Sequence, residues 1–184
     1  MSEISSWLRR WPQAQQAGAT ALDLACGSGR HVRHLAALGM KVTGVDRDAA
    51  AIAPLRSLAE IIESDMESGP WPLENRCFDL VLVTNYLWRP LLPRIMAAVA
   101  PGGWLIYETF AAGQQTVGRP SRPEFLLQPG ELLQACEGLR IVAYEDGWEE
   151  DGGPVNGRFV QRVAAIRPAP GGPDHLRYQL PCPR

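Results

Sequence analysis

The sequence of 184 residues predicts a doubly wound α/β fold: a mainly parallel, seven-stranded sheet with an antiparallel C-terminal hairpin. Two observations predict it. Short runs of branched apolar residues alternate with helical patterns, and a glycine-rich turn follows the first run. Strands that alternate with helices form a parallel sheet covered on both faces, because each crossover places a helix on one face. The length fits one domain over 1–167, with an irregular Pro- and Gly-rich tail over 168–184.

The N-terminal half contains three short strands, each followed by a helix or a loop. A segment with helical character precedes them. The first strand ends in Gly-Ser-Gly, and Gly39 ends the helix that follows. Apolar, β-branched runs predict the strands, and helical spacing or alanine content predicts the helices. We expect strands over 20–26, 41–45 and 61–63, and helices over 30–38 and 49–58.

The C-terminal half continues the alternation and closes with two strands. A helix precedes Pro101-Gly102-Gly103, and a further strand follows these residues. The run 151–154 is Gly- and Pro-rich and permits a reversal, so the last two strands are expected to form an antiparallel hairpin. We expect strands over 78–84, 104–109, 139–145 and 158–167, and helices over 89–100 and 130–136.

Segment 111–128 is unusually long for a connection without strands or helices. Structureless connections of this length are uncommon unless they are lids or binding loops. The segment follows the fifth strand, so it would overhang the carboxyl edge of the sheet. We expect a substrate lid; the alternative is a surface connection held down by Phe125-Leu126-Leu127.

Composition excludes some classes of protein. The formal net charge is −2, which does not favour a nucleic-acid partner. No run of about 18 apolar residues predicts a membrane helix, and the N-terminus lacks the apolar core of a signal peptide, so a cytoplasmic location is expected. The four cysteines are widely spaced, and we expect free thiols and no metal site.

Chemistry-bearing residues gather at the ends of the first two strands. Gly27 and Gly29 form the turn after the first strand, where glycines let the backbone approach a ligand. Asp46 ends the second strand, where a carboxylate can bind both ribose hydroxyls of a nucleoside. Both features suit an adenosine-containing cofactor. The third glycine of the dinucleotide motif is replaced by Val32, which disfavours NAD, and Asp23 suits a cationic ligand better than a pyrophosphate.

The run Asp23-Leu24-Ala25-Cys26-Gly27-Ser28-Gly29 resembles the first signature of class I S-adenosylmethionine-dependent methyltransferases, which have a Rossmann-like fold. Ala25 stands where that signature usually has its first glycine. The resemblance implies that Asp46 binds the ribose and that Asp65-Met66 contacts the adenine. The run 78–83 resembles the fourth-strand signature. The expected cofactor-binding residues are Asp23, Ala25, Cys26, Gly27, Gly29, Asp46, Arg47, Asp65, Met66 and Asn85.

A finer resemblance involves the second half of the chain. The runs 107–110, 118–120, 123–127 and 129–133 are similar to small bacterial methyltransferases of the tellurite-resistance (TehB-like) type. This resemblance implies a small-molecule acceptor. The fourth strand is not followed by an Asn-Pro-Pro-Tyr-like run, and this absence argues against amide- and adenine-nitrogen methyltransferases.

Five residues are candidates for the acceptor side of the site, and all of them except Tyr107 are expected to be catalytic. Arg89 and Arg119 could hold an anionic group of the acceptor, and Glu108 could act as a base or orient one. Tyr86 follows the fourth strand and is the fourth candidate. Methyl transfer from a sulfonium is an in-line displacement, so positioning and exclusion of water carry most of the catalysis.

Other readings stay open. A methyltransferase acting on RNA or protein is one alternative, and a non-catalytic domain that binds an adenosyl ligand is another. A nicotinamide-dependent enzyme is a third. His31 and His34 are expected to be solvated or to have capping roles, because neither has a partner at ligand spacing in the sequence. The sequence does not name the oligomeric state.

Overall fold

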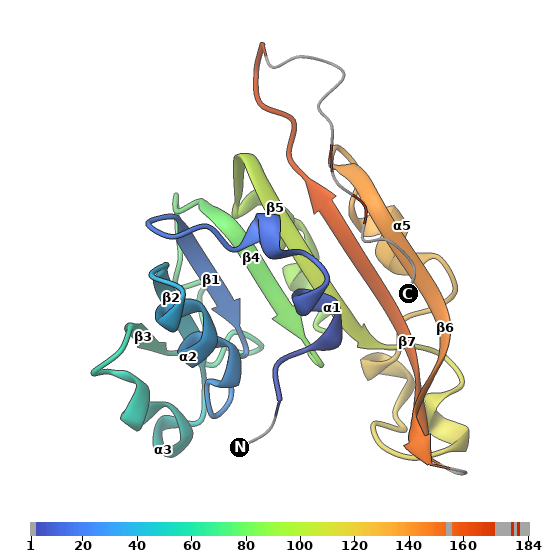
Figure 1. Ribbon diagram of the computed structural model, residues 1–184. Coiled ribbons are helices and arrows are strands. Elements are labelled where there is room, and N and C mark those ends of the chain that lie inside the picture. Colours follow the sequence, from blue (N-terminus) through green and yellow to red (C-terminus); the bar gives the residue numbers. More distant parts are fainter. Residues whose placement is uncertain (1–2, 154–155, 172–177, 179, 181–184) are drawn as a thin grey trace.

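A computed structural model describes residues 3–153, 156–171, 178 and 180 (Figure 1). Most of the expected tail over 168–184 lies outside the described residues; residues 168–171 form no helix or strand. One residue of the tail contacts the domain, because the Tyr178 ring packs edge-on against Trp104, with 5.9 Å between ring centroids.

The sheet has seven strands in the order β3-β2-β1-β4-β5-β7-β6 (Figure 1). Neighbouring strands from β3 to β5 are parallel, whereas β7 is antiparallel to both β5 and β6. This arrangement confirms the predicted doubly wound sheet with its C-terminal hairpin. The strands are β1 (Thr20–Leu24), β2 (Lys41–Asp46), β3 (Glu60–Glu63), β4 (Phe78–Thr84), β5 (Val99–Phe110), β6 (Arg140–Gly153) and β7 (Asn156–Ile166).

Short helices cover both faces of the sheet. One face carries the N-terminal helices, and the other carries the two helices that flank β5 in sequence (Figure 1). The α-helices are α1 (Ser6–Arg9), α2 (Arg30–Ala37), α3 (Ala49–Ile52), α4 (Leu92–Ala97) and α5 (Glu131–Ala135); the 3-10 turns are η1 (Pro12–Ala14), η2 (Ala53–Leu55), η3 (Arg89–Leu91), η4 (Gln114–Thr116) and η5 (Pro123–Phe125).

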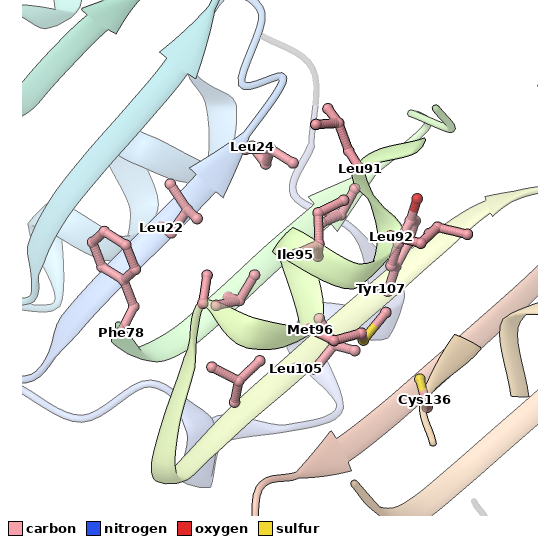
Figure 2. Close-up of a cluster of buried hydrophobic side chains, with 14 of the residues drawn as sticks. Leu22, Leu24, Phe78, Leu91, Leu92, Ile95, Met96, Leu105, Tyr107 and Cys136 are labelled. Carbon is pink, nitrogen blue, oxygen red and sulfur yellow. The ribbon is translucent and has the colours of Figure 1, made fainter. Parts of the chain in front are cut away.

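Each face of the sheet has its own apolar core. On one side, α1, α2 and α3 bury Trp7, Leu35 and Ile52 against the sheet. On the other side, α4 buries Ile95 against Tyr107 of β5 (Figure 2). Two cores on opposite faces are the expected result of crossovers that pass on both sides of a parallel sheet.

The predicted helix over 89–100 and the strand after it are placed differently in the structure. The chain forms η3 and then α4, which ends at Ala97, and β5 already begins at Val99 and pairs with Phe78. Gly103 permits this continuation, because a Cβ there would lie 2.8 Å from the Phe78 carbonyl oxygen. The Pro-Gly-Gly run therefore lies within an irregular part of the strand rather than in a separate loop.

Two further predicted elements differ in length. The helix expected over 49–58 becomes α3 followed by η2, since Pro54 has no backbone N–H to continue an α-helical ladder. The strand expected over 139–145 extends to Gly153, which pairs with Asn156 of β7. The hairpin therefore runs past Phe110, whose partner is Val160, and overhangs the carboxyl end of β5. The longer hairpin therefore extends the sheet at the edge where ligands bind in such folds.

Candidate cofactor and acceptor site

The turn after β1 has the backbone conformation of a ligand-binding loop. Ala25, Gly27 and Gly29 all have positive φ, at 53°, 54° and 78°. A Cβ at Gly27 would meet nothing within 4 Å, whereas one at Gly29 would lie 2.3 Å from Leu55 Cδ1. Gly27 therefore leaves space on the open side of the turn, and Gly29 permits close packing of the turn on the core. Ala25 adopts the strained conformation without being glycine.

Asp46 joins the end of β2 to this turn. Its Oδ2 accepts a hydrogen bond from the Gly27 backbone N–H at 2.7 Å, and its Oδ1 accepts one from the Asp48 N–H at 3.0 Å. The Cys26 N–H also donates to the Val45 carbonyl oxygen at 3.0 Å. The acid and the glycine turn, predicted separately, thus form one unit at the carboxyl edge of the sheet.

A pocket of about 180 Å³ opens beside this unit. It lies at the carboxyl ends of β1, β2, β3 and β4, where the strand order changes direction between β1 and β4. Such a switch point is the usual ligand site of open α/β sheets. The pocket brings together five predicted cofactor residues and one predicted acceptor residue; its lining is Ala25, Asp46, Arg47, Ser64, Asp65, Met66, Glu67 and Tyr86.

Asp65 and Met66 follow β3 and differ in burial. Met66 is 6% exposed and belongs to the apolar core, while Asp65 is exposed. The Asp65 carboxylate accepts hydrogen bonds from the Ser68 hydroxyl and the Glu67 N–H, and these lower its pKa. The carboxylate is therefore ionised and held in a fixed direction at the rim of the pocket.

Asp23 is a buried carboxyl group beside the cofactor turn. It is 1% exposed, neither of its oxygens has a hydrogen-bond partner among the described residues, and burial raises its pKa to about 7. Its neighbour is His31, whose Nδ1 lies 4.0 Å from Asp23 Oδ1. A buried carboxylate without a partner is costly, so this position favours a cationic ligand nearby.

His31 is buried, so the expectation of a solvated role was wrong. It is 1% exposed, and its Nε2 accepts a hydrogen bond from the Ser5 N–H at 3.1 Å. This bond requires a lone pair on Nε2, and burial lowers the pKa of the imidazole to about 3. His31 is therefore neutral. It connects the N-terminal segment to α2, a tertiary contact that sequence spacing could not reveal.

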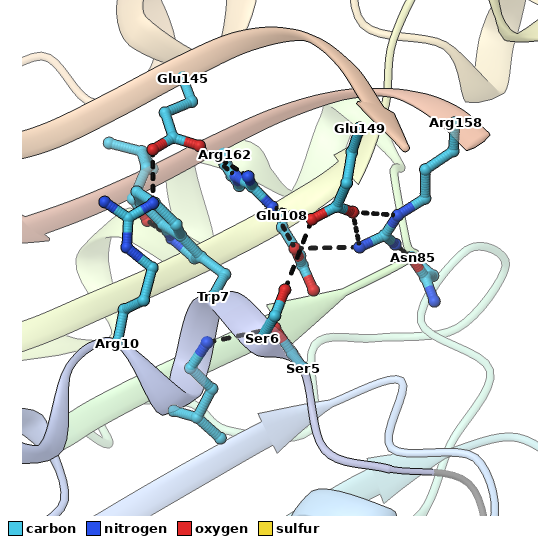
Figure 3. A network of polar contacts seen from close by, with 12 residues as sticks. Ser5, Ser6, Trp7, Arg10, Asn85, Glu108, Glu145, Glu149, Arg158 and Arg162 are labelled. Carbon is cyan, nitrogen blue, oxygen red and sulfur yellow. Dashed lines mark hydrogen bonds and ion pairs between the residues drawn. The ribbon is translucent and has the colours of Figure 1, made fainter. Parts of the chain in front are cut away.

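Glu108 lies at the carboxyl edge of β5 in a network of charged side chains (Figure 3). It is 1% exposed, and its Oε2 lies 3.4 Å from Arg158 and 3.8 Å from Arg162. Its Oε1 is buried without a partner. Asn85, another predicted site residue, joins the network because its Oδ1 accepts a hydrogen bond from Arg158 at 3.2 Å.

The two arginines of this network were missed by the sequence analysis. Glu149 lies opposite Arg158 and Glu145 opposite Arg162 in the register of β6 and β7, and both pairs form ion pairs at 2.7 Å. Opposite charges at directly facing positions stabilise a hairpin. The signal was present in the sequence, since Glu145 and Glu149 are four residues apart, as are Arg158 and Arg162.

Arg89, expected on the acceptor side, is bound to other parts of the protein. Its guanidinium binds both carboxylate oxygens of Glu131, at 2.6 and 2.9 Å, and donates to the carbonyls of Glu124 and Leu126 at 2.8 Å. The donors are therefore used to hold segment 111–128 against α5. The sequence could not reveal these contacts, because the ion-pair partner lies 42 residues further along the chain.

Segment 111–128 is held down at its ends and exposed in its middle. Leu126 and Leu127 are buried, and the Leu127 N–H donates to the Phe110 carbonyl oxygen at 3.0 Å. Residues 115–119 are exposed, and they include Arg119, the other arginine expected on the acceptor side. The anchoring by Leu126 and Leu127 matches the alternative of a stitched surface connection, and a lid function remains a proposal.

The remaining candidates have simple environments. Cys26 and Cys136 are buried free thiols and Cys77 is an exposed one, while Cys182 lies outside the described residues. Burial raises the pKa of the Cys26 thiol, so Cys26 packs as a neutral group beside the turn. Within the described ranges, no three His, Cys, Asp or Glu side chains come together as a metal site, and no helix is long and apolar enough to span a membrane.

Comparisons with known proteins agree with this geometry. Residues 21–103 match a family described as a methyltransferase domain. Ubiquinone biosynthesis O-methyltransferase from Burkholderia cenocepacia is 33% identical over 107 residues, 52% of this chain and 46% of that protein. Trans-aconitate 2-methyltransferase from Paracidovorax citrulli is 35% identical over 99 residues, 48% and 38% respectively. The chain therefore aligns with less than half of the length of these curated relatives.

The fold has a close counterpart among solved structures. TehB from Haemophilus influenzae superposes with a TM-score of 0.71 and 19% identity, over 91% of this chain and 63% of that one. At this identity the similarity concerns the fold. It confirms the predicted Rossmann-like architecture, and the domain match over residues 21–103 agrees with the family that the sequence predicted.

Proposed function

We propose that this chain, which carries a class I methyltransferase domain, transfers the methyl group of S-adenosylmethionine to a small-molecule acceptor. One observation supports the proposal most directly: the Asp46 carboxylate binds the Gly27 N–H at the mouth of a pocket that Asp65 and Met66 also line. A ribose-binding acid, a glycine turn and an adenine-contacting pair are thus adjacent.

The residues present fit this cofactor. Gly27 leaves open space on the exposed side of the turn, where a ligand can approach the backbone. Asp23 has two unpartnered carboxylate oxygens, and the cofactor carries an ammonium and a sulfonium that such a group attracts. We assign the ribose to Asp46, the adenine to Asp65 and Met66, and the cationic end to the side of Asp23.

The bound cofactor would supply a methyl group on a positively charged sulfur, which leaves as a neutral thioether. The chain must then hold the acceptor in line and exclude water, which can lower the barrier by about 7–11 kcal/mol. The overhanging β6–β7 hairpin and segment 111–128 are placed to cover this edge. We propose that segment 111–128 acts as the lid, with its exposed centre as the moving part.

We place Glu108 and Arg119 on the acceptor side. Glu108 Oε1 has no hydrogen-bond partner among the described residues, so it can accept a proton or a hydrogen bond from an acceptor hydroxyl or amine. Arg119 is exposed on segment 111–128 and can pair with an anionic group of the acceptor. Asn85 positions Arg158 beside Glu108.

Calorimetric titration of the purified chain with S-adenosylmethionine and S-adenosylhomocysteine, with NAD as the control ligand, tests the cofactor. We expect micromolar binding of the two adenosyl ligands and none of NAD. A folded sample that binds neither adenosyl ligand contradicts the proposal. Binding without S-adenosylhomocysteine release in any acceptor screen would favour the non-catalytic alternative.

Glu108→Gln tests the acceptor side separately. This variant keeps the side-chain shape but removes the proton-accepting charge. We expect unchanged affinity for S-adenosylhomocysteine and a turnover rate lower by about 10²–10⁴-fold, the usual contribution of a general base. Turnover within a factor of two of the native rate would exclude Glu108 as the base.

A further inference from the structure

Tyr86 follows β4 and ends in a buried hydroxyl group. The hydroxyl oxygen is buried and has no hydrogen-bond partner among the described residues. Buried Tyr hydroxyls normally find a partner, because an unsatisfied polar group costs about 1–3 kcal/mol. The side chain lines the pocket formed by Ala25, Asp46 and Met66. A ligand that fills that pocket is therefore the candidate partner for this hydroxyl group.

The backbone holds this side chain in a defined direction. Asn85 has a positive φ of 55°, and its N–H donates to the Glu108 carbonyl oxygen at 2.9 Å. The Tyr86 carbonyl oxygen in turn accepts a hydrogen bond from the Tyr107 hydroxyl at 2.9 Å. The turn after β4 thus directs Asn85 to the Glu108 network and Tyr86 to the pocket.

The surroundings of the hydroxyl favour its role as a donor. Burial raises the pKa of Tyr86, and the neighbouring carboxylates of Glu67 and Asp65 raise it further, while Arg47 opposes them. The phenol therefore remains protonated. These charged neighbours belong to the nucleoside side of the pocket rather than to the network around Glu108.

We propose that Tyr86 binds the nucleoside half of the cofactor through its hydroxyl, instead of acting on the methyl acceptor. The ligand class is an adenine nucleoside, whose ring nitrogens and ribose oxygens accept hydrogen bonds. This inference rests on the proposed function. It moves Tyr86 from the acceptor side to the cofactor pocket.

Tyr86→Phe removes only the hydroxyl. The probes are S-adenosylhomocysteine and methylthioadenosine, which has the nucleoside and the sulfur but no amino-acid half. We expect the Kd of both probes to rise by the same factor, about two- to tenfold, the contribution of one hydrogen bond. The melting temperature of the free variant should not fall, since the lost hydroxyl had no partner there.

Tyr144→Phe is the matched control. The Tyr144 hydroxyl donates to Asp146 at 3.1 Å on β6, away from the pocket, so this variant should bind both probes as the native chain does. Native-like binding by Tyr86→Phe would overturn the inference. A loss for S-adenosylhomocysteine alone would also overturn it, because the hydroxyl would then bind the amino-acid half.

The failure of the proposed function is visible before any variant is made. If the folded native chain binds neither probe, both the function and the assignment of Tyr86 fail. If the native chain binds both probes and Tyr86→Phe merely lowers the melting temperature, only the assignment of Tyr86 fails, and the residue is structural.

Discussion

The Asp46 carboxylate accepts a 2.7 Å hydrogen bond from the backbone N–H of Gly27, so the end of β2 and the turn after β1 hold each other in position. Asp46→Asn keeps the shape but loses the charge. We expect its affinity for S-adenosylhomocysteine to fall by about 10- to 100-fold, since a hydrogen bond to a charged group contributes about 1.5–3 kcal/mol. Calorimetric titration of the native chain and of Asp46→Asn with S-adenosylhomocysteine measures this loss of affinity.

Asp48→Asn is the control for this change. Asp48 lies in the same loop, but its carboxylate caps α3 by accepting a hydrogen bond from the Ala51 N–H at 3.0 Å. Its substitution should change affinity by less than about twofold. Equal losses in both variants would show that the loop charge, rather than the contact with Gly27, governs binding.

The two glycines of the turn should respond differently to substitution by alanine. Gly29→Ala places a methyl group 2.3 Å from the Leu55 Cδ1 position, within a fully buried side chain. We expect a loss of about 2–4 kcal/mol in the free energy of unfolding, from positive φ and overpacking together. Gly27→Ala should lose only about 1–2 kcal/mol but bind the cofactor more weakly.

Urea unfolding and calorimetry on the two variants check this difference. Each variant's free energy of unfolding is compared with its affinity for S-adenosylhomocysteine. The new methyl group at Gly27 projects into open space, so it should affect affinity more than stability. If Gly27→Ala binds S-adenosylhomocysteine as the native chain does, the ligand does not approach this part of the turn.

The pKa shifts of Asp23 and His31 have opposite effects on the pH dependence of stability, and these effects cancel in the native chain. Between about pH 3.8 and 6.5 the unfolded chain has an ionised Asp23 and a protonated His31, while the folded chain has a protonated Asp23 and a neutral His31. Each state binds one proton at this pair, so the pair adds no slope to stability against pH.

Single substitutions should reveal the two opposing slopes. In Asp23→Asn the lowered pKa of His31 remains, so stability rises with pH up to about 6.5. In His31→Gln the raised pKa of Asp23 remains, so stability is fully present below about pH 3.8 and is lost as pH rises towards 7. In each variant the free energy of unfolding should change by roughly 4 kcal/mol over this pH range, because the slope is about 1.4 kcal/mol per pH unit.

Urea unfolding at several pH values, expressed as differences from the native chain, measures these slopes. The difference removes the contribution of His34, whose pKa burial also lowers. Profiles that run parallel to the native one in both variants would mean that the pair is charged in the folded state.

Arg89 should control the order of segment 111–128. Arg89→Ala removes the ion pair with Glu131 and the donors to the Glu124 and Leu126 carbonyls. We expect a loss of about 2 kcal/mol in stability and faster amide hydrogen exchange across the segment. Arg94→Ala is the control, because Arg94 pairs with the exposed Glu74 and such surface pairs contribute about 0–1 kcal/mol.

Unchanged exchange in Arg89→Ala would assign the anchoring of the segment to Leu126 and Leu127 instead. These two side chains are buried, so they are the other contacts that could hold it. The comparison thus separates an arginine clamp from simple apolar packing.

Much of the site was predictable because its residues follow strand ends. Parallel strands bring their carboxyl ends to one edge, so Gly27, Asp46 and Asp65 had to lie near one another once the alternation was recognised. The limits of α4 and β5 were less predictable. Continuation of the sheet from Val99 through Gly103 depends on pairing with Phe78, a contact that helical spacing does not express.

The sequence by itself determined the order of strands and helices, the glycine turn and the acids that follow β2 and β3, because these depend on local periodicity and turn chemistry. Only the tertiary structure decided the partners of individual side chains. Arg89 pairs with Glu131, His31 accepts a hydrogen bond from Ser5, and Tyr86 lines the pocket beside Asp46. The physical reason is that burial and hydrogen bonding join segments far apart in the chain, and local patterns carry no record of those contacts.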